Sequence, residues 1–112
     1  MTSVVIFSGD DGIAGFEASG HSGYAESGSD IVCAAISAIL QTACIGLTSV
    51  AGIPVRMRRS DRDGYLRAML PANLTENQQR DAQVIFKTAQ AGLTAVMNEY
   101  PGHVRVISRK RR

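Results

Sequence analysis

The feature that most constrains the fold is an uncharged segment of 23 residues, 31–53. A helix of this length could cross a bilayer. However, weakly polar side chains recur through it at helical spacing, namely Cys33, Ser37, Gln41, Cys44 and Thr48. No anchor residues flank it, and a helix of this kind is typical of a protein core. We therefore expect a core helix, without a membrane, that ends at Gly52 because Pro54 blocks its continuation.

The remaining patterns predict five strands and one further helix. The strands are expected at 4–8, 13–19, 55–59, 65–70 and 104–108, and the second helix at 75–100, opened by a capping box and stopped by Pro101-Gly102. The order is β-β-α-β-β-α-β. It predicts an α+β fold with a mixed sheet and two helices packed on one face.

Alternation within the strands predicts which side chains face the core. In the second strand, Ala14, Phe16 and Ala18 should share one face. In the third, Val55 and Met57 should point inward, and the arginines of 55–59 should point to solvent.

The length of 112 residues predicts one domain, 1–108, followed by a basic and disordered tail, 109–112. A domain this small would gain buried surface by forming a homodimer. Cys33 and Cys44 would lie about 16 Å apart on one helix, too far for a disulfide. With no signal peptide at the start, the two free thiols indicate a cytoplasmic protein.

Charge is divided between the two halves of the chain. Residues 1–53 hold five acidic residues and no Lys or Arg, a net charge of −5, and residues 54–112 hold twelve basic and five acidic residues, a net charge of +7. These values add to the overall +2. Ordinary solvated surfaces explain such a division, as does attraction of a basic protein to the first half or of RNA to the second.

One stretch carries the residue types of an activated nucleophile. The core helix is expected to begin at Asp30 as N-cap, which would place Cys33 at N3 beside unpaired N–H groups and the positive end of the helix dipole. That environment favours the thiolate, the nucleophilic form. His21 lies just before the loop and is the better candidate base, with His103 as the alternative. Cys44, in mid-helix, is expected to be an inert buried thiol.

The loop 22–29 between this histidine and cysteine is small and polar. Residues expected to line the substrate site or form a lid are Gly20, Ser22, Gly23, Tyr24, Glu26 and Gly28. Such a loop is equally typical of a mobile lid over an active site and of an ordinary surface connection.

Two segments, Gly20-His21-Ser22-Gly23-Tyr24-Ala25 and Gly28-Ser29-Asp30-Ile31-Val32-Cys33-Ala34-Ala35-Ile36-Ser37-Ala38, resemble the ribosomal-processing cysteine protease family, Prp. The resemblance covers essentially the whole chain. It implies a dimeric bacterial cytoplasmic protease, without metal or cofactor. It also implies removal of the N-terminal extension of a large-subunit ribosomal protein, the twenty-seventh of its series, after a hydrophobic stretch ending in Phe-Phe.

In this family resemblance, His21 and Cys33 match the catalytic pair, and Gly20, Asp30 and Ser37 match neighbouring positions. Asp30 either caps the helix or orients His21. Ser37 lies one turn beyond Cys33 and either hydrogen-bonds in the site or bonds back to its own helix. Backbone N–H groups at the helix start are expected to stabilise the oxyanion.

Two other functions remain open from the residues alone. A non-enzymatic ribosome-associated protein would bind RNA through its basic C-terminal half, with Arg56, Arg58, Arg59 and the tail. A redox or thiol-storing protein is disfavoured because no resolving cysteine lies within reach of Cys33.

Overall fold

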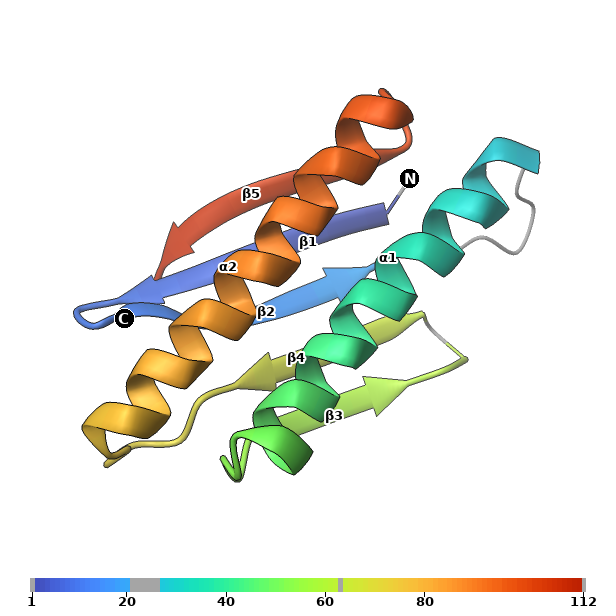
Figure 1. Ribbon diagram of the computed structural model, residues 1–112. Helices are drawn as coiled ribbons and strands as arrows, with labels where there is room; N and C mark the ends of the chain where they lie inside the picture. The colour runs from blue at the N-terminus through green and yellow to red at the C-terminus, as the bar shows by residue number, and fades with distance from the viewer. Residues whose placement is uncertain (1, 21–26, 63, 112) are drawn as a thin grey trace.

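Two β-hairpins, each followed by a helix, build the chain, and a last strand closes it (Figure 1). The computed structural model describes residues 2–20, 27–62 and 64–111. The elements are β1 (Thr2–Gly9), β2 (Gly12–Ser19), α1 (Ser27–Ile45), the π-helical turn η1 (Gly46–Val50), β3 (Arg56–Ser60), β4 (Tyr65–Met69), α2 (Glu76–Glu99) and β5 (Val104–Lys110).

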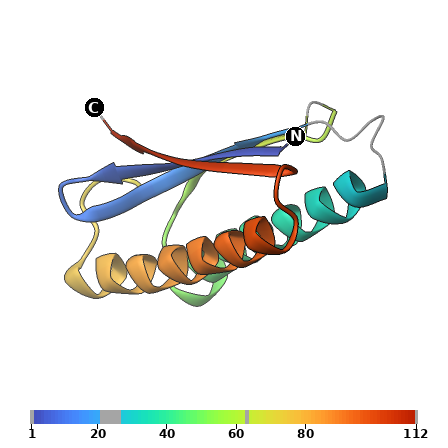
Figure 2. The same cartoon turned by 90° about the horizontal axis from the view of Figure 1, so that it is seen from above.

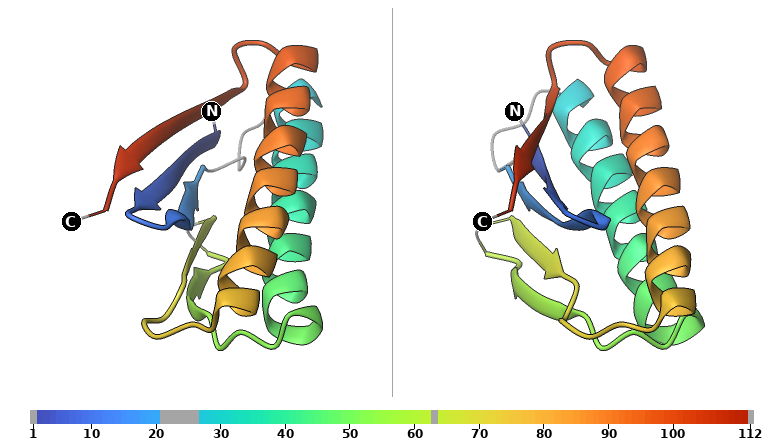
Figure 3. Two further views of the ribbon diagram at one scale, coloured as in Figure 1. Left: turned by 60° about the vertical axis from the view of Figure 1, so that its left-hand side comes forward. Right: turned by 90° about the vertical axis from the view of Figure 1, so that its left-hand side faces the viewer.

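The five strands form one mixed sheet in the order β3-β4-β2-β1-β5. β1 pairs with β5 in parallel, and the other neighbours are antiparallel. Both helices lie on the same face of the sheet, and no helix formed by the described residues covers its other face (Figures 2 and 3). The predicted α+β fold, its element order and its two helices on one face are confirmed.

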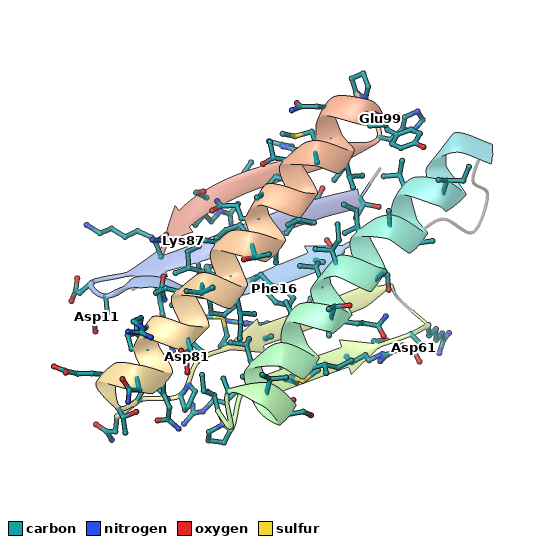
Figure 4. All side chains as sticks on the ribbon, in the orientation of Figure 1. Asp11, Phe16, Asp61, Asp81, Lys87 and Glu99 are labelled. Atoms are coloured by element: carbon teal, nitrogen blue, oxygen red, sulfur yellow. The ribbon has the colours of Figure 1, made fainter. Side chains whose placement is uncertain are left out.

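The core lies between the sheet and the two helices. Its fully buried side chains include Val4, Phe16, Val32, Ile36, Leu40, Leu47, Ile53 and Leu93. Phe16 projects from β2 beneath the helices (Figure 4), and its ring meets Phe86 of α2 edge to face, with centroids 6.3 Å apart. This geometry is one that aromatic pairs prefer, so Phe16 joins the central strand to α2.

The uncharged segment 31–53 forms the expected core helix. Every third or fourth side chain of α1 is buried against the sheet, from Val32 through Ile36 and Leu40, and η1 adds Leu47. The opposite side, including Ile31 and Ile45, is exposed. By length and composition, Ile31–Val50 would also suffice to cross a membrane. Gly52 has φ of +68°, which a glycine adopts without strain, and it ends the helix where expected.

The expected start of this helix is wrong. α1 begins at Ser27, so Asp30 lies within the helix and is not its N-cap. Gly28 belongs to the first turn rather than to the preceding loop. Serine and glycine are tolerated in and around a first helical turn, which lets the helix extend toward the loop.

The capping box of α2 is present as predicted. The Gln78 N–H donates to Thr75 Oγ1 at 3.1 Å, and the Thr75 N–H donates to Gln78 Oε1 at 3.0 Å. Further along, the Gln83 side chain accepts from the Ile13 N–H and donates to the Ile13 carbonyl, both at 2.8 Å. Helix α2 is thereby tied to the start of β2.

For the third strand, the predicted inward orientation of Met57 is confirmed, and the predicted outward orientation of Arg59 is wrong. Met57 faces the helices because it pairs with Ala68, yet it is 45% exposed, since β3 is an edge strand that the helices do not fully cover. Arg59 also lies on the helix-facing side rather than with Arg56 and Arg58, because it pairs with Leu66.

The chain end also departs from the expectation of a tail from 109. β5 continues through Arg109 and Lys110, which pair with Phe7 and Ser8 of β1. The Arg111 N–H then donates to the Ser8 carbonyl at 2.6 Å. Pairing through the backbone is independent of the side chains, so basic residues can continue the strand.

Candidate active site

A cavity of about 390 Å³ lies between the N-terminal half of α1 and the neighbouring ends of β2, β3 and β4. Its polar wall includes Thr2, Cys33, Ser37, Gln41, Arg59 and Asp61. Apolar side chains of Ile36, Leu40 and Leu66 also line it. The cavity therefore combines a half-buried thiol with an apolar surface, which is typical of a ligand site.

Cys33 lies half-buried on α1, with Sγ 3.0 Å from Oγ1 of Thr2. It is six residues beyond Ser27, about 9 Å along the helix axis. The prediction that Cys33 is at N3 is wrong, because the helix begins at Ser27. Unpaired N–H groups and the effect of the dipole are confined to the first turn, so neither acts on the Cys33 thiol. The polar neighbour of this thiol is therefore a strand hydroxyl rather than the helix terminus.

The position of Thr2 beside Cys33 is fixed by burial and by backbone hydrogen bonds. It is 6% exposed in β1, where it pairs with Val104 of β5. Its N–H donates to the His103 carbonyl at 3.2 Å. The hydroxyl is therefore positioned by the sheet before any substrate binds.

Gly20 fits closely against Thr2 at the end of β2. A Cβ at position 20 would lie 2.7 Å from the Thr2 Cα and 3.0 Å from its Oγ1. Any larger residue would displace the threonine that contacts Cys33. The glycine before His21 is therefore required by this close approach rather than by an unusual φ.

Ser37 and Gln41 follow Cys33 along the same side of α1 and line the same cavity. The Gln41 Nε2 donates to Ser37 Oγ at 2.6 Å. The expected proximity of Ser37 to Cys33 is confirmed. The hydrogen-bond partner of Ser37 is the side chain of Gln41, one turn further along the same helix. On the facing wall, Arg59 and Asp61 form an ion pair at 2.6 Å; Figure 4 shows Asp61 at the end of β3.

Several predicted site residues lie outside the described residues: His21, Ser22, Gly23, Tyr24 and Glu26. Gly28 and Asp30 are described only as part of the α1 backbone. The alternative base, His103, precedes β5 and has its carbonyl bonded to Thr2. It is not among the described residues that line the Cys33 cavity.

Thr2, Gln41 and Arg59 are site residues that sequence reasoning did not assign. Gln41 recurs at helical spacing from Cys33 and Ser37, which was an available signal. Thr2 is 31 positions from Cys33, and only the pairing of β1 in the sheet brings it there. Assigning Arg59 to the site requires knowing which face of β3 it occupies, and this follows from its pairing with Leu66.

The second cysteine has a different environment. Cys44 is 4% exposed in the core. Burial raises the pKa of its thiol, an effect that nearby Arg59 partly offsets. The prediction of an inert buried thiol agrees with this environment, because a raised pKa leaves less of the reactive thiolate.

Alkylation should therefore separate the two thiols. Treating the folded protein with iodoacetamide at pH 7.5 is expected to modify Cys33 at least about tenfold faster than Cys44, since thiolate character and access govern the rate. Peptide mass spectrometry measures both sites. The same treatment in urea should modify the two equally, and faster labelling of Cys44 in the folded protein would contradict this assignment.

Residues 1–105 match the family described as Cysteine protease Prp. The chain belongs to this family. A curated relative, the ribosomal processing cysteine protease Prp of Bacillus subtilis (strain 168), is 29% identical over 97 residues, which is 87% of each chain. Membership of the Prp family makes the protein a cysteine protease, and it replaces the alternatives of a non-enzymatic RNA-binding protein and a thiol-storing protein.

Solved structures agree with the fold. Prp from S. aureus, in complex with a substrate peptide, matches with a TM-score of 0.85 at 24% identity, covering 97% of this chain and 100% of that one. A protein from Streptococcus mutans matches with a TM-score of 0.84 at 23% identity, covering 99% of this chain and 96% of that one. The Prp fold therefore extends over nearly the whole chain.

Proposed function

We propose that this cysteine protease removes the N-terminal extension of a large-subunit ribosomal protein, the twenty-seventh of its series, by cutting after a hydrophobic stretch that ends in Phe-Phe. The observation that carries the proposal is the Cys33 thiol in the wall of a cavity that also has an apolar lining. The ribosomal processing named for the Bacillus subtilis relative supports the choice of substrate.

Cys33 is the nucleophile in this proposal, and His21 is its general base. His21 directly follows Gly20, which lines the same cavity as Cys33 and contacts Thr2. His21 takes the thiol proton, and the sulfur attacks the carbonyl carbon of the last phenylalanine. The C–N bond breaks as His21 returns the proton to the leaving amine. Water then hydrolyses the thioester, releasing the acid and restoring the thiol.

Thr2 acts as a positioning residue for the sulfur. Its hydroxyl donates to the Cys33 thiolate once the proton has left, and bonds to an ionised partner are stronger than neutral ones. The backbone pairing of Thr2 fixes the hydroxyl in advance, so little reorganisation accompanies the reaction. The helix start, placed about 9 Å away along α1, does not supply this stabilisation.

Replacing Thr2 by valine tests this role. The shape is nearly retained, but the hydroxyl is lost, so kcat/KM should fall about tenfold with KM little changed, as expected for losing a bond to a charged group. The rate of Cys33 alkylation should fall in parallel, which a purely structural role would not cause. Thr2→Ser should recover most of the activity. A Thr2→Val enzyme with normal kcat and alkylation rate would contradict the role.

The substrate class is supported by two properties of the chain. Ile36, Leu40 and Leu66 give the cavity an apolar lining that suits aromatic side chains. The net charge of −5 over residues 1–53 complements the basic body of a ribosomal protein behind the scissile bond. The segment 22–26, which precedes the observed start of α1, is proposed to close over the bound peptide, with Tyr24 and Glu26 in contact with it.

Cleavage of a synthetic peptide tests the proposed function. An apolar segment ending in Phe-Phe-Ala-Lys should be cut once, after the second phenylalanine, as mapped by mass spectrometry. A matched peptide with Ala-Ala in place of Phe-Phe should be cut much more slowly. His21→Ala should lose activity by about a hundredfold or more, the usual contribution of a general base. Equal cleavage of both peptides would contradict the proposed specificity.

A cytoplasmic homodimer remains part of the proposal. Exposed apolar side chains on the helix layer, namely Ile31, Ile45, Val50 and Val84, support self-association. Light scattering after size exclusion should give about twice the chain mass of 11.9 kDa. A mass equal to one chain at micromolar concentration would contradict it.

A further inference from the structure

The sheet face that carries no helix has a distinct chemistry (Figures 2 and 3). Strand pairing orders its side chains in three rows, from β5 across to β3. The rows are Arg109-Phe7-Gly15-Met69-Arg56, Ile107-Val5-Glu17-Arg67-Arg58 and Arg105-Ser3-Ser19-Tyr65-Ser60. We name this surface the open face. Among the paired residues that the structure describes, the open face holds five arginines and one carboxylate.

The arginines occupy both edges of the open face. Arg105 and Arg109 lie on β5, and Arg56 and Arg58 lie on β3, four strand spacings or about 19 Å away. All four side chains are exposed. Within the part of the chain that the structure describes, none of the four forms an ion pair. Their charge is therefore available to a partner.

The centre of the open face is neutralised and partly apolar. Glu17 lies 3.9 Å from the Arg67 guanidinium and accepts a hydrogen bond from the Tyr65 hydroxyl at 3.1 Å. The Arg67 guanidinium lies over the Phe7 ring, 5.6 Å from its centroid. The Glu17 carboxylate is thus already engaged, and the middle of the open face carries little net charge between its two basic edges.

The positive charge of the exposed arginines indicates which kind of partner binds the open face. A second copy of the chain would bring the same arginines together, which is unfavourable between like charges. The peptide substrate is assigned to the cavity that α1 lines; this cavity reaches Ser19, Ser60 and Tyr65 of the third row, but no arginine of the open face lines it. A polyanion with regularly spaced charges matches exposed arginines at two edges.

We propose that the open face binds RNA through its phosphates, with Arg56, Arg58, Arg105 and Arg109 as the main contacts. The choice of RNA among polyanions rests on the proposed function, because the nucleic acid beside a ribosomal protein is RNA. Phosphate contacts carry no sequence information, so binding is largely independent of base sequence. The protease could thereby stay near its substrate while the catalytic side remains open.

Fluorescence anisotropy with a labelled 20-nucleotide oligouridylate measures this binding without cleavage, so its result is separate from that of the protease assay. The wild-type protein should bind at 50 mM salt, and log K should fall with log salt with a slope of about −3, as expected for four phosphate contacts on a single strand. An acidic peptide of matched charge should compete poorly.

The decisive comparison uses two triple variants of equal charge change. Arg56→Ser/Arg58→Ser/Arg105→Ser should weaken RNA binding at least about tenfold and reduce the slope to about −1. The control Arg62→Ser/Arg80→Ser/Lys87→Ser removes three exposed basic residues elsewhere, one of them the Lys87 of α2 labelled in Figure 4, and should bind much more tightly than the first variant.

Both triple variants should retain their circular dichroism spectrum and peptide cleavage, since neither changes the core or the Cys33 cavity. Three results would overturn the proposal. These are no RNA binding by the wild-type protein at 50 mM salt, equal weakening in both variants, or stronger binding of the acidic peptide than of RNA.

Discussion

The Cys33→Ala protein is expected to fold normally and to cleave the Phe-Phe-Ala-Lys peptide at least about a thousandfold more slowly than wild type, because it lacks the nucleophile. The side chain is half-buried at the cavity wall, so its loss should change stability little. Initial rates from product mass spectrometry measure the loss, and circular dichroism verifies the fold.

Cys44→Ala is the matched control, because it makes the same chemical change eleven residues further along the same helix. Cys44 is buried away from the cavity lining, so activity should remain within about threefold of wild type while stability falls by about 1 kcal/mol. Equal loss of activity in both variants would show that each cysteine is needed for the folded structure, and it would contradict a specific catalytic role for Cys33. Retained activity in the Cys33→Ala protein would contradict the proposal that Cys33 is the nucleophile.

The largest effect on stability is expected from Phe16→Ala. Phe16 is 1% exposed at the centre of the sheet and packs edge to face on Phe86. Its truncation removes buried apolar surface and leaves a cavity between β2 and α2, so the free energy of unfolding should fall by about 3–5 kcal/mol. Urea unfolding followed by circular dichroism measures this loss.

Phe7→Ala offers the matched control for Phe16 on the adjacent strand. Phe7 lies on the open face, where water reaches it and Arg67 covers it only in part. The same truncation there should lower the free energy of unfolding by about 1 kcal/mol, mainly through the lost arginine contact. Comparable losses in the two variants would contradict the assignment of the core to the helix-facing side.

Most of the fold could be predicted because its signals are local. Apolar spacing over 31–53 and 75–100 determined the two helices, and the capping box at Thr75 forms as expected. Alternation correctly placed Phe16 and Ala18 on one face of the second strand, and that face is the buried one. Each of these patterns depends on neighbours within one or two turns, which a sequence displays directly.

The errors concern features that depend on distant pairing. The continuation of β5 through Lys110 depends on the parallel register with β1, which no local pattern specifies. The side taken by Arg59 follows from its pairing with Leu66. The contact of Thr2 with Cys33 joins residues 31 positions apart. Sequence motifs could therefore single out Cys33 as the proposed nucleophile without identifying the hydroxyl beside it.

The start of α1 illustrates a different limit. Asp30 is a favoured N-cap type, but helix boundaries are weakly specified when serines and a glycine precede the apolar run. The observed start at Ser27 moves Cys33 out of the first turn, so the group beside its thiol is the Thr2 hydroxyl rather than the helix terminus.

The central claim is that Cys33 attacks a peptide bond following Phe-Phe. The most direct test is an affinity label, a short apolar peptide ending in Phe-Phe chloromethyl ketone, incubated with the wild-type protein and analysed by intact-mass and peptide mass spectrometry. One adduct per chain is expected, located on Cys33, with protection by excess Phe-Phe-Ala-Lys peptide. An adduct on Cys44, or no adduct at Cys33 in a folded protein that iodoacetamide still labels there, would contradict it.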